Sequence, residues 1–257
     1  MKTLYLFITN LLATSLVAFG QCDAPSPQQN AAYEKVVNEL QRQFRNNLPA
    51  GNWQIFDERH SLGKLQLSDE YGKLFRVCGD RYDLTLERAE AARERRAQID
   101  SAVAQADPNR QEKSLVISTD SVYRESGPAG TKVAQQNTVD INVEMNAGNY
   151  RLEEPISNRF VQNYKVISVK GAPLALQITL KPDENGIQPR PETVVLLGNW
   201  KNKLNADARS GKFYRYSYAK GGTLIENLVV TIKGPFDVAN DIVRKVDWAT
   251  LANTLTK

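Results

Sequence analysis

The clearest alternation of apolar and polar positions lies in the second half of the chain. Between residues 138 and 145, valine, isoleucine and methionine occupy every second position, and polar residues stand between them. This period of two is typical of a strand that buries one face. Alternation or short apolar runs predict further strands at 115–118, 164–170, 174–180, 193–197, 213–218 and 224–233.

Two short loops predict how some of these strands pair. A Gly-Ala-Pro turn and a Lys-Gly-Gly turn each separate two predicted strands. They predict one hairpin that pairs 164–170 with 174–180 and another that pairs 213–218 with 224–233. The apolar run 193–197 fits a central strand, which is buried on both faces.

Apolar residues at spacings of three and four predict two helices in the first half. The first follows residue 30 and stops at Pro49, and its apolar face holds Tyr33, Val36, Val37, Leu40, Phe44 and Leu48. The second spans 84–106, where alanine, glutamate and arginine favour a helix but leave only a thin apolar stripe. Between them, short strands at 53–56, 64–67 and 73–78 predict a small meander.

The chain ends in a further amphipathic helix. Val238, Ile242 and Val246 fall on one face, and Asp237 fits an N-cap or a first-turn acid. The elements together predict an α+β fold: a helical N-terminal region with a small meander at 31–112, then a mainly antiparallel β-sheet domain at 113–257, closed by the C-terminal helix. A two-sheet sandwich is the alternative for the second region.

Residues 1–20 have the pattern of an export signal. A basic start precedes an apolar run, and Ala18 and Gly20 supply the small residues that a signal peptidase needs before Gln21. The run is shorter than the ~20 residues of a membrane-spanning helix. We therefore expect a secreted or periplasmic protein with no transmembrane span, in which residues 21–30 form an extended tether.

Cys22 and Cys78 are the two cysteines of the chain. In an oxidising compartment, such a pair most simply forms one disulfide. A lipid anchor at Cys22 is disfavoured, because Gln21 and Phe19 stand where that signal wants a small and a branched aliphatic residue. The third alternative is that Cys78 is a buried small apolar residue.

Composition excludes several function classes. The chain has 33 basic and 29 acidic residues, a formal net charge of +4, so we expect no nucleic-acid partner. The single histidine, His60, excludes a multi-histidine metal site, and no metal or other cofactor is expected. His60 stands beside Asp57 and Glu58, where it fits a polar turn better than a general base.

Catalysis has weak support in the sequence. No G-x-S-x-G motif is present, and neither cysteine has a reactive context. A glycosidase needs only two carboxylates at a set separation. The β-rich region offers several, without a means of choosing among them: Glu144, Glu153, Glu154, Asp183 and Glu184.

The most suggestive binding feature is a row of tyrosines. Alternation places Tyr214, Tyr216 and Tyr218 on one strand face, and Trp200 and Lys212 stand in the preceding segment, which is read as a loop. An exposed row would stack on a carbohydrate or a protein ligand, and nearby cations favour acidic partners. The alternative is that the row packs into the core, since tyrosine packs well in strands.

The sequence thus predicts an exported, non-catalytic binding or interaction module. A carboxylate-based extracytoplasmic hydrolase is the first alternative. The second is an envelope structural or assembly subunit that binds through the charged helix at 84–106, whose mixed signs are also typical of a solvated helix.

Overall fold

The computed structural model describes residues 26–61, 80–105, 136–154, 159–183, 186–207, 211–218 and 224–255. The predicted signal segment, both cysteines and the predicted strands at 64–67, 73–78 and 115–118 lie outside these ranges. The fold is α+β, with a large antiparallel sheet and a helical C-terminus, as predicted.

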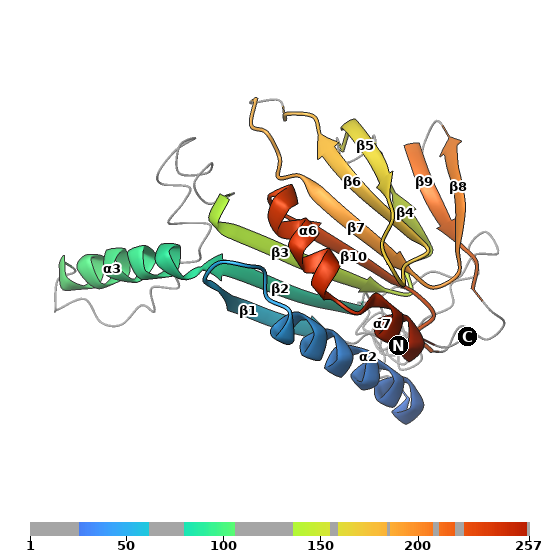
Figure 1. The fold of residues 1–257 in the computed structure, drawn as a ribbon, viewed down its shortest axis with the longest axis horizontal. Coiled ribbons are helices and arrows are strands. Elements are labelled where there is room, and N and C mark those ends of the chain that lie inside the picture. Colours follow the sequence, from blue (N-terminus) through green and yellow to red (C-terminus); the bar gives the residue numbers. More distant parts are fainter. Residues whose placement is uncertain are drawn as a thin grey trace, which may run out of the picture.

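Seven strands form the larger sheet, in the order β1-β2-β3-β10-β7-β6-β5, and all neighbouring pairs are antiparallel (Figure 1). Their bounds are β1 Trp53–Ser61, β2 Asp80–Arg88, β3 Thr138–Met145, β5 Val161–Ile167, β6 Leu174–Leu180, β7 Glu192–Leu197 and β10 Leu228–Lys233. A smaller sheet has the order β4-β9-β8, with β4 Asn149–Arg151, β8 Trp200–Asp207 and β9 Gly211–Tyr216.

Helices cover one face of the seven-stranded sheet. These are α2 Pro27–Asn46, α6 Phe236–Lys245 and α7 Trp248–Thr254 (Figure 1). Their apolar side chains, among them Leu40, Ile242 and Trp248, share one buried cluster with alternate residues of the strands. The amphipathic C-terminal segment therefore covers the sheet, because that is how both elements remove an apolar face from water.

The first helix starts earlier than predicted. It begins at Pro27, inside the segment expected to be a tether, because Ser26 and Gln29 form a capping box. The Ser26 hydroxyl accepts from the Gln29 N–H at 3.2 Å, and the Gln29 side chain accepts from the Ser26 N–H at 2.9 Å. Proline at the first helical position also favours this start, because the N–H that it lacks would have no acceptor within the helix.

Both ends of the described chain meet in this helical layer. The Gln43 side-chain oxygen of α2 accepts from the Asp247 N–H at 3.0 Å, just before α7. Lys245 donates to the Leu48 carbonyl at 2.9 Å, and the Asp241 carboxylate accepts from the Ala50 N–H at 2.6 Å. These bonds join residues about two hundred positions apart in sequence.

A second apolar cluster lies on the opposite face of the seven-stranded sheet. It combines residues of β5, β6, β7 and β10 with residues of the smaller sheet, such as Leu176, Leu196 and Tyr214. The smaller sheet therefore buries this part of the face.

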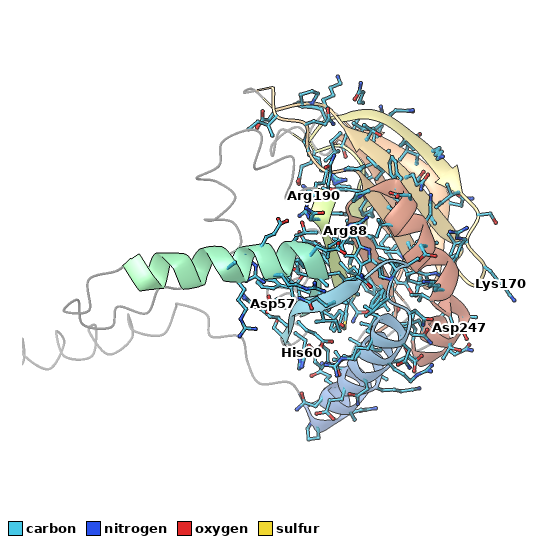
Figure 2. The ribbon with its side chains drawn as sticks, turned by 60° about the vertical axis from the view of Figure 1, so that its left-hand side comes forward. Asp57, His60, Arg88, Lys170, Arg190 and Asp247 are labelled. Carbon is cyan, nitrogen blue, oxygen red and sulfur yellow. The ribbon has the colours of Figure 1, made fainter. Side chains whose placement is uncertain are left out.

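The predicted helix at 84–106 is wrong in its first residues. Residues 84–88 belong to β2, and the helix α3 spans Ala89–Gln105 and projects from the body (Figures 1 and 2). Tyr82, Leu84 and Leu86 continue an alternation that pairs with strands on both sides. This burial outweighs local helix propensity.

The predicted hairpin between 213–218 and 224–233 is also wrong. β9 pairs with β8 and β4, whereas β10 lies between β3 and β7 in the other sheet. The segment after Trp200, read as a loop, is strand β8. The hairpin between 164–170 and 174–180 is confirmed, as are the strand at 138–145 and the central position of 193–197.

Candidate binding site on the polar half of the sheet

The face of the seven-stranded sheet that lies opposite the helices changes character at β10. One row of cross-strand neighbours runs Asp83, Asn142, Thr231, Val194, Leu176 from β2 to β6. The next row runs Arg81, Glu144, Val229, Leu196, Leu174. The smaller sheet packs on the apolar ends of both rows. Within the described residues, it does not pack on their polar ends. We call the side chains of β2, β3 and β10 on this face the polar half.

A basin of about 500 Å³ lies over the polar half. Strand β4 and the segment around Arg159 form its far wall. The lining residues are Arg81, Asp83, Asn142, Val143, Glu144, Asn149, Tyr150, Arg151, Glu154, Arg159, Glu192, Val229, Thr231 and Lys233.

An arginine network builds the wall where the two sheets meet. Arg159 donates to Glu192 at 2.5 Å and to the Tyr150 hydroxyl at 3.1 Å. Arg151 pairs with Glu154 beside it. Burial raises the pKa of Tyr150 above its usual value. The wall is thus held by ion pairs and hydrogen bonds among its own side chains.

The floor of the basin is partly organised as well. Asn142 donates to Asp83 at 2.7 Å, which fixes both side chains across β2 and β3. Asp140, which precedes Asn142 on the same face of β3, accepts from Thr85 at 2.9 Å and also binds Arg190.

Three charged groups of the polar half are open to a ligand. In the described part of the chain, no side-chain hydrogen bond or ion pair engages Arg81, Glu144 or Lys233, and the first two are exposed. Arg81 and Glu144 are cross-strand neighbours of opposite charge. The basin therefore presents both signs of charge within one site.

The predicted tyrosine row lies on one strand face and is turned inward. Tyr214 and Tyr216 are buried, and Tyr218 packs against them from the partly buried edge of the second cluster. The ring of Tyr216 contacts those of Trp200 and Tyr218 at centroid distances of 5.2 and 5.1 Å. Its hydroxyl donates to the Glu226 carbonyl at 2.9 Å. Burial raises the pKa of both Tyr214 and Tyr216.

The other two predicted binding residues lie apart from the basin. Trp200 is buried and donates its indole N–H to the Leu197 carbonyl at 3.0 Å. Lys212 is exposed and pairs with Glu153 at 3.1 Å. These two positions and the buried tyrosines share no ligand-facing surface.

The histidine region is divided between the two faces of β1. His60 packs against the ring of Tyr33 from α2, with 6.2 Å between the ring centroids. Asp57, on the other face, pairs with Arg59 at 2.8 Å. Both His60 and Asp57 are labelled in Figure 2. Glu58 lies on the helix side. Burial raises its pKa, but hydrogen bonds from Arg45 and Tyr82 outweigh that effect and hold the pKa below its usual value. Within the described ranges, no cluster of three metal-ligating side chains occurs.

Two of the five carboxylates considered for hydrolysis lie together, and the others lie elsewhere. Glu144 and Glu154 both line the basin. Glu153 is paired with Lys212, Asp183 lies in an exposed loop, and Glu184 is outside the described residues.

Apart from Glu144 and Glu154, the residues that line the basin were not singled out from the sequence. The signal was present in β3, where the polar positions of the alternation, including Asn142 and Glu144, share one face. Their alignment with Arg81, Asp83 and Thr231 depends on strand register between distant segments, which the alternation does not give.

No known protein family, curated protein or solved structure matches this chain. Among the described helices, none has the length and apolarity needed to cross a membrane. The basin is therefore the feature of the molecule that points to a function.

Proposed function

We propose that this protein is an exported, non-catalytic binding module that holds a polypeptide ligand on the polar half of its sheet. The observation that carries the proposal is the change from polar to apolar side chains at β10. The smaller sheet covers the apolar part, and a basin of about 500 Å³ remains over the polar part.

The lining favours a ligand that carries both signs of charge. Arg81 and Glu144 are adjacent and open, and Lys233 lies at the opposite side of the floor. A polypeptide segment with acidic and basic side chains can complement such a surface, since complementary charges give specificity at interfaces. Among the described lining residues, the one aromatic ring is that of Tyr150, which is buried. The described lining thus offers no exposed aromatic ring on which a sugar could stack.

The paired carboxylates support a non-catalytic role. Glu192 and Glu154 each bind an arginine, and Asp83 accepts from Asn142. These groups are engaged in holding the basin together. The export part of the proposal rests on the signal-like pattern of residues 1–20.

A displayed peptide library tests the proposal directly. Peptides selected on the immobilised protein would be synthesised and titrated against wild-type protein and Arg81→Glu. We expect at least about tenfold weaker binding by Arg81→Glu, equivalent to about 1.4 kcal/mol, and weaker binding as salt is added. The matched control is Lys201→Glu, the same charge change at an exposed position of β8.

Two outcomes would overturn the proposal. One is that the library yields no binder, or only binders that Arg81→Glu leaves unaffected. The other is that an oligosaccharide substrate panel releases cleaved product, with activity lost in Glu144→Gln, which would establish the hydrolase alternative.

A further inference from the structure

Strand β5 ends the seven-stranded sheet with an unprotected edge. It pairs with β6 on one side and is the last strand in the order, at the end of the sheet opposite β1 (Figure 1). Within the described residues, no backbone hydrogen bond joins β5 to a strand on its outer side. Such an edge presents free N–H and C=O groups to a second strand.

Exposed apolar side chains gather at this edge. Five large apolar side chains are exposed in the described part of the chain, and four of them are here: Phe160, Tyr164, Val166 and Ile187, each between 36 % and 58 % exposed. Two backbone bonds hold the loop of Ile187 near the start of β5: Lys181 N–H to Phe160, at 2.9 Å, and Asp183 N–H to Ile187, at 3.0 Å. Apolar surface concentrated in this way is typical of a contact site.

The edge has little of the usual protection against pairing. Proline and clusters of charge keep most edges apart. Strand β5 contains no proline and no acidic residue, and its one charge is Lys165.

We propose that the β5 edge binds β5 of a second copy of this chain, antiparallel and centred on Tyr164. A twofold axis there places Tyr164 opposite its own copy and Lys165 opposite Asn163 of the other copy. No two like charges meet, and the two rings form a cross-strand aromatic pair. Because the same edge serves both copies, the contact is closed and yields a dimer with one continuous sheet.

The helix-side rim of the edge is compatible with this contact. A groove of about 440 Å³ runs beside Lys165 and Ile167, and Asp237 and Arg244 of α6 also line it. The groove thus carries both signs of charge, as a surface that pairs with a copy of itself needs.

Sedimentation velocity over a concentration series tests the dimer. We expect wild-type protein to shift from monomer to dimer mass as concentration rises. Tyr164→Lys and Tyr164→Asp each place like charges on the axis and should weaken association at least tenfold. An equal mixture of the two variants places lysine opposite aspartate and should restore the dimer.

The control is Phe56→Ser, which removes an exposed apolar ring from β1 at the other end of the sheet and should leave association unchanged. Circular dichroism and thermal unfolding establish that each variant is folded. A wild-type protein that stays monomeric at all concentrations would overturn the proposal. Dimerisation of Tyr164→Lys alone, or failure of the mixture to associate, would equally overturn it. Arg81→Glu, in the polar half, should leave the dimer intact, so this test and that of the peptide ligand fail independently.

Discussion

Arg95 of α3 binds the completely buried Glu87 at the end of β2 through two hydrogen bonds, of 2.9 and 3.2 Å. The same guanidinium lies over the ring of Phe56, 4.5 Å from its centroid. The projecting helix α3 is therefore joined to the sheet at its base by a charge pair on the same face as the polar half.

Removing one partner of this pair should be strongly destabilising. Arg95→Ala leaves the Glu87 carboxylate buried without its cation, and we expect a loss of about 3 to 5 kcal/mol in the free energy of unfolding. Urea denaturation measures this loss. Arg96→Ala, at an exposed neighbouring position, is the control. The double variant Arg95→Leu with Glu87→Met removes both charges and should recover much of the loss; equal destabilisation by Arg95→Ala and Arg96→Ala would contradict the role of the pair.

Asp241 should make stability depend on pH. A hydrogen bond from Lys245 and another from the Ala50 N–H lower the pKa of Asp241. A carboxylate whose pKa is lower in the folded state stabilises the protein above its unfolded pKa, near 3.9, and that contribution disappears as pH falls through the folded pKa. Asp241→Asn should therefore be less stable than wild type at pH 7, by about 1 kcal/mol.

The difference between wild type and Asp241→Asn should disappear toward pH 2. Thermal unfolding at a series of pH values measures it. Asp57→Asn, at a partly exposed pair on β1, is the comparison and should change little. A constant difference between Asp241→Asn and wild type across the series would contradict the assignment.

Two glycines with the same backbone conformation should respond differently to alanine. Gly51 has φ +85°, and a Cβ added there would have no atom within 4 Å. Gly171 has φ +88°, and a Cβ added there would lie 2.5 Å from the Ala249 nitrogen at the start of α7. Gly51→Ala should cost about 1 to 2 kcal/mol, the left-handed penalty alone. Gly171→Ala should cost clearly more, since the turn must move away from α7. Urea denaturation compares them, and equal costs would contradict the close approach.

Tyr216 should act as a core residue. Tyr216→Ala should lose about 3 to 5 kcal/mol of stability, because a buried aromatic ring is deleted. Tyr216→Phe should lower the free energy of unfolding by about 1 kcal/mol, because it removes the hydroxyl that donates to the Glu226 carbonyl. Arg215→Ala, exposed on the other face of β9, should stay within about 0.5 kcal/mol. A folded and stable Tyr216→Ala would return the tyrosine row to consideration as a binding surface.

Much of the fold could be predicted because a strand or helix that buries one face has apolar residues at the period of that element. The alternation in β3 and the apolar run in β7 identified those strands and the central position of β7. The start of α3 was misplaced, because Leu84 and Leu86 are good helix formers and their strand role depends on partners far along the chain.

The pairing of β10 shows a different limit. Neighbouring strands in sequence often form hairpins, which favoured β9 as its partner. Leu228, Val229 and Val230 are buried in succession, however, so this strand needs cover on both faces and lies between β3 and β7. The basin was missed for the same reason, since Asp83, Asn142 and Thr231 become neighbours only through that order.

The contact between α2 and α7 affects the order in which the protein can be completed. Gln43 is synthesised about two hundred residues before Asp247, whose N–H it accepts from. Until then, the apolar face of α2 lacks the α7 side chains that help to cover it, among them Leu251. The nascent chain therefore cannot complete its helical layer before α7 has been synthesised, and until then this layer stays open to chaperones and to unfolding.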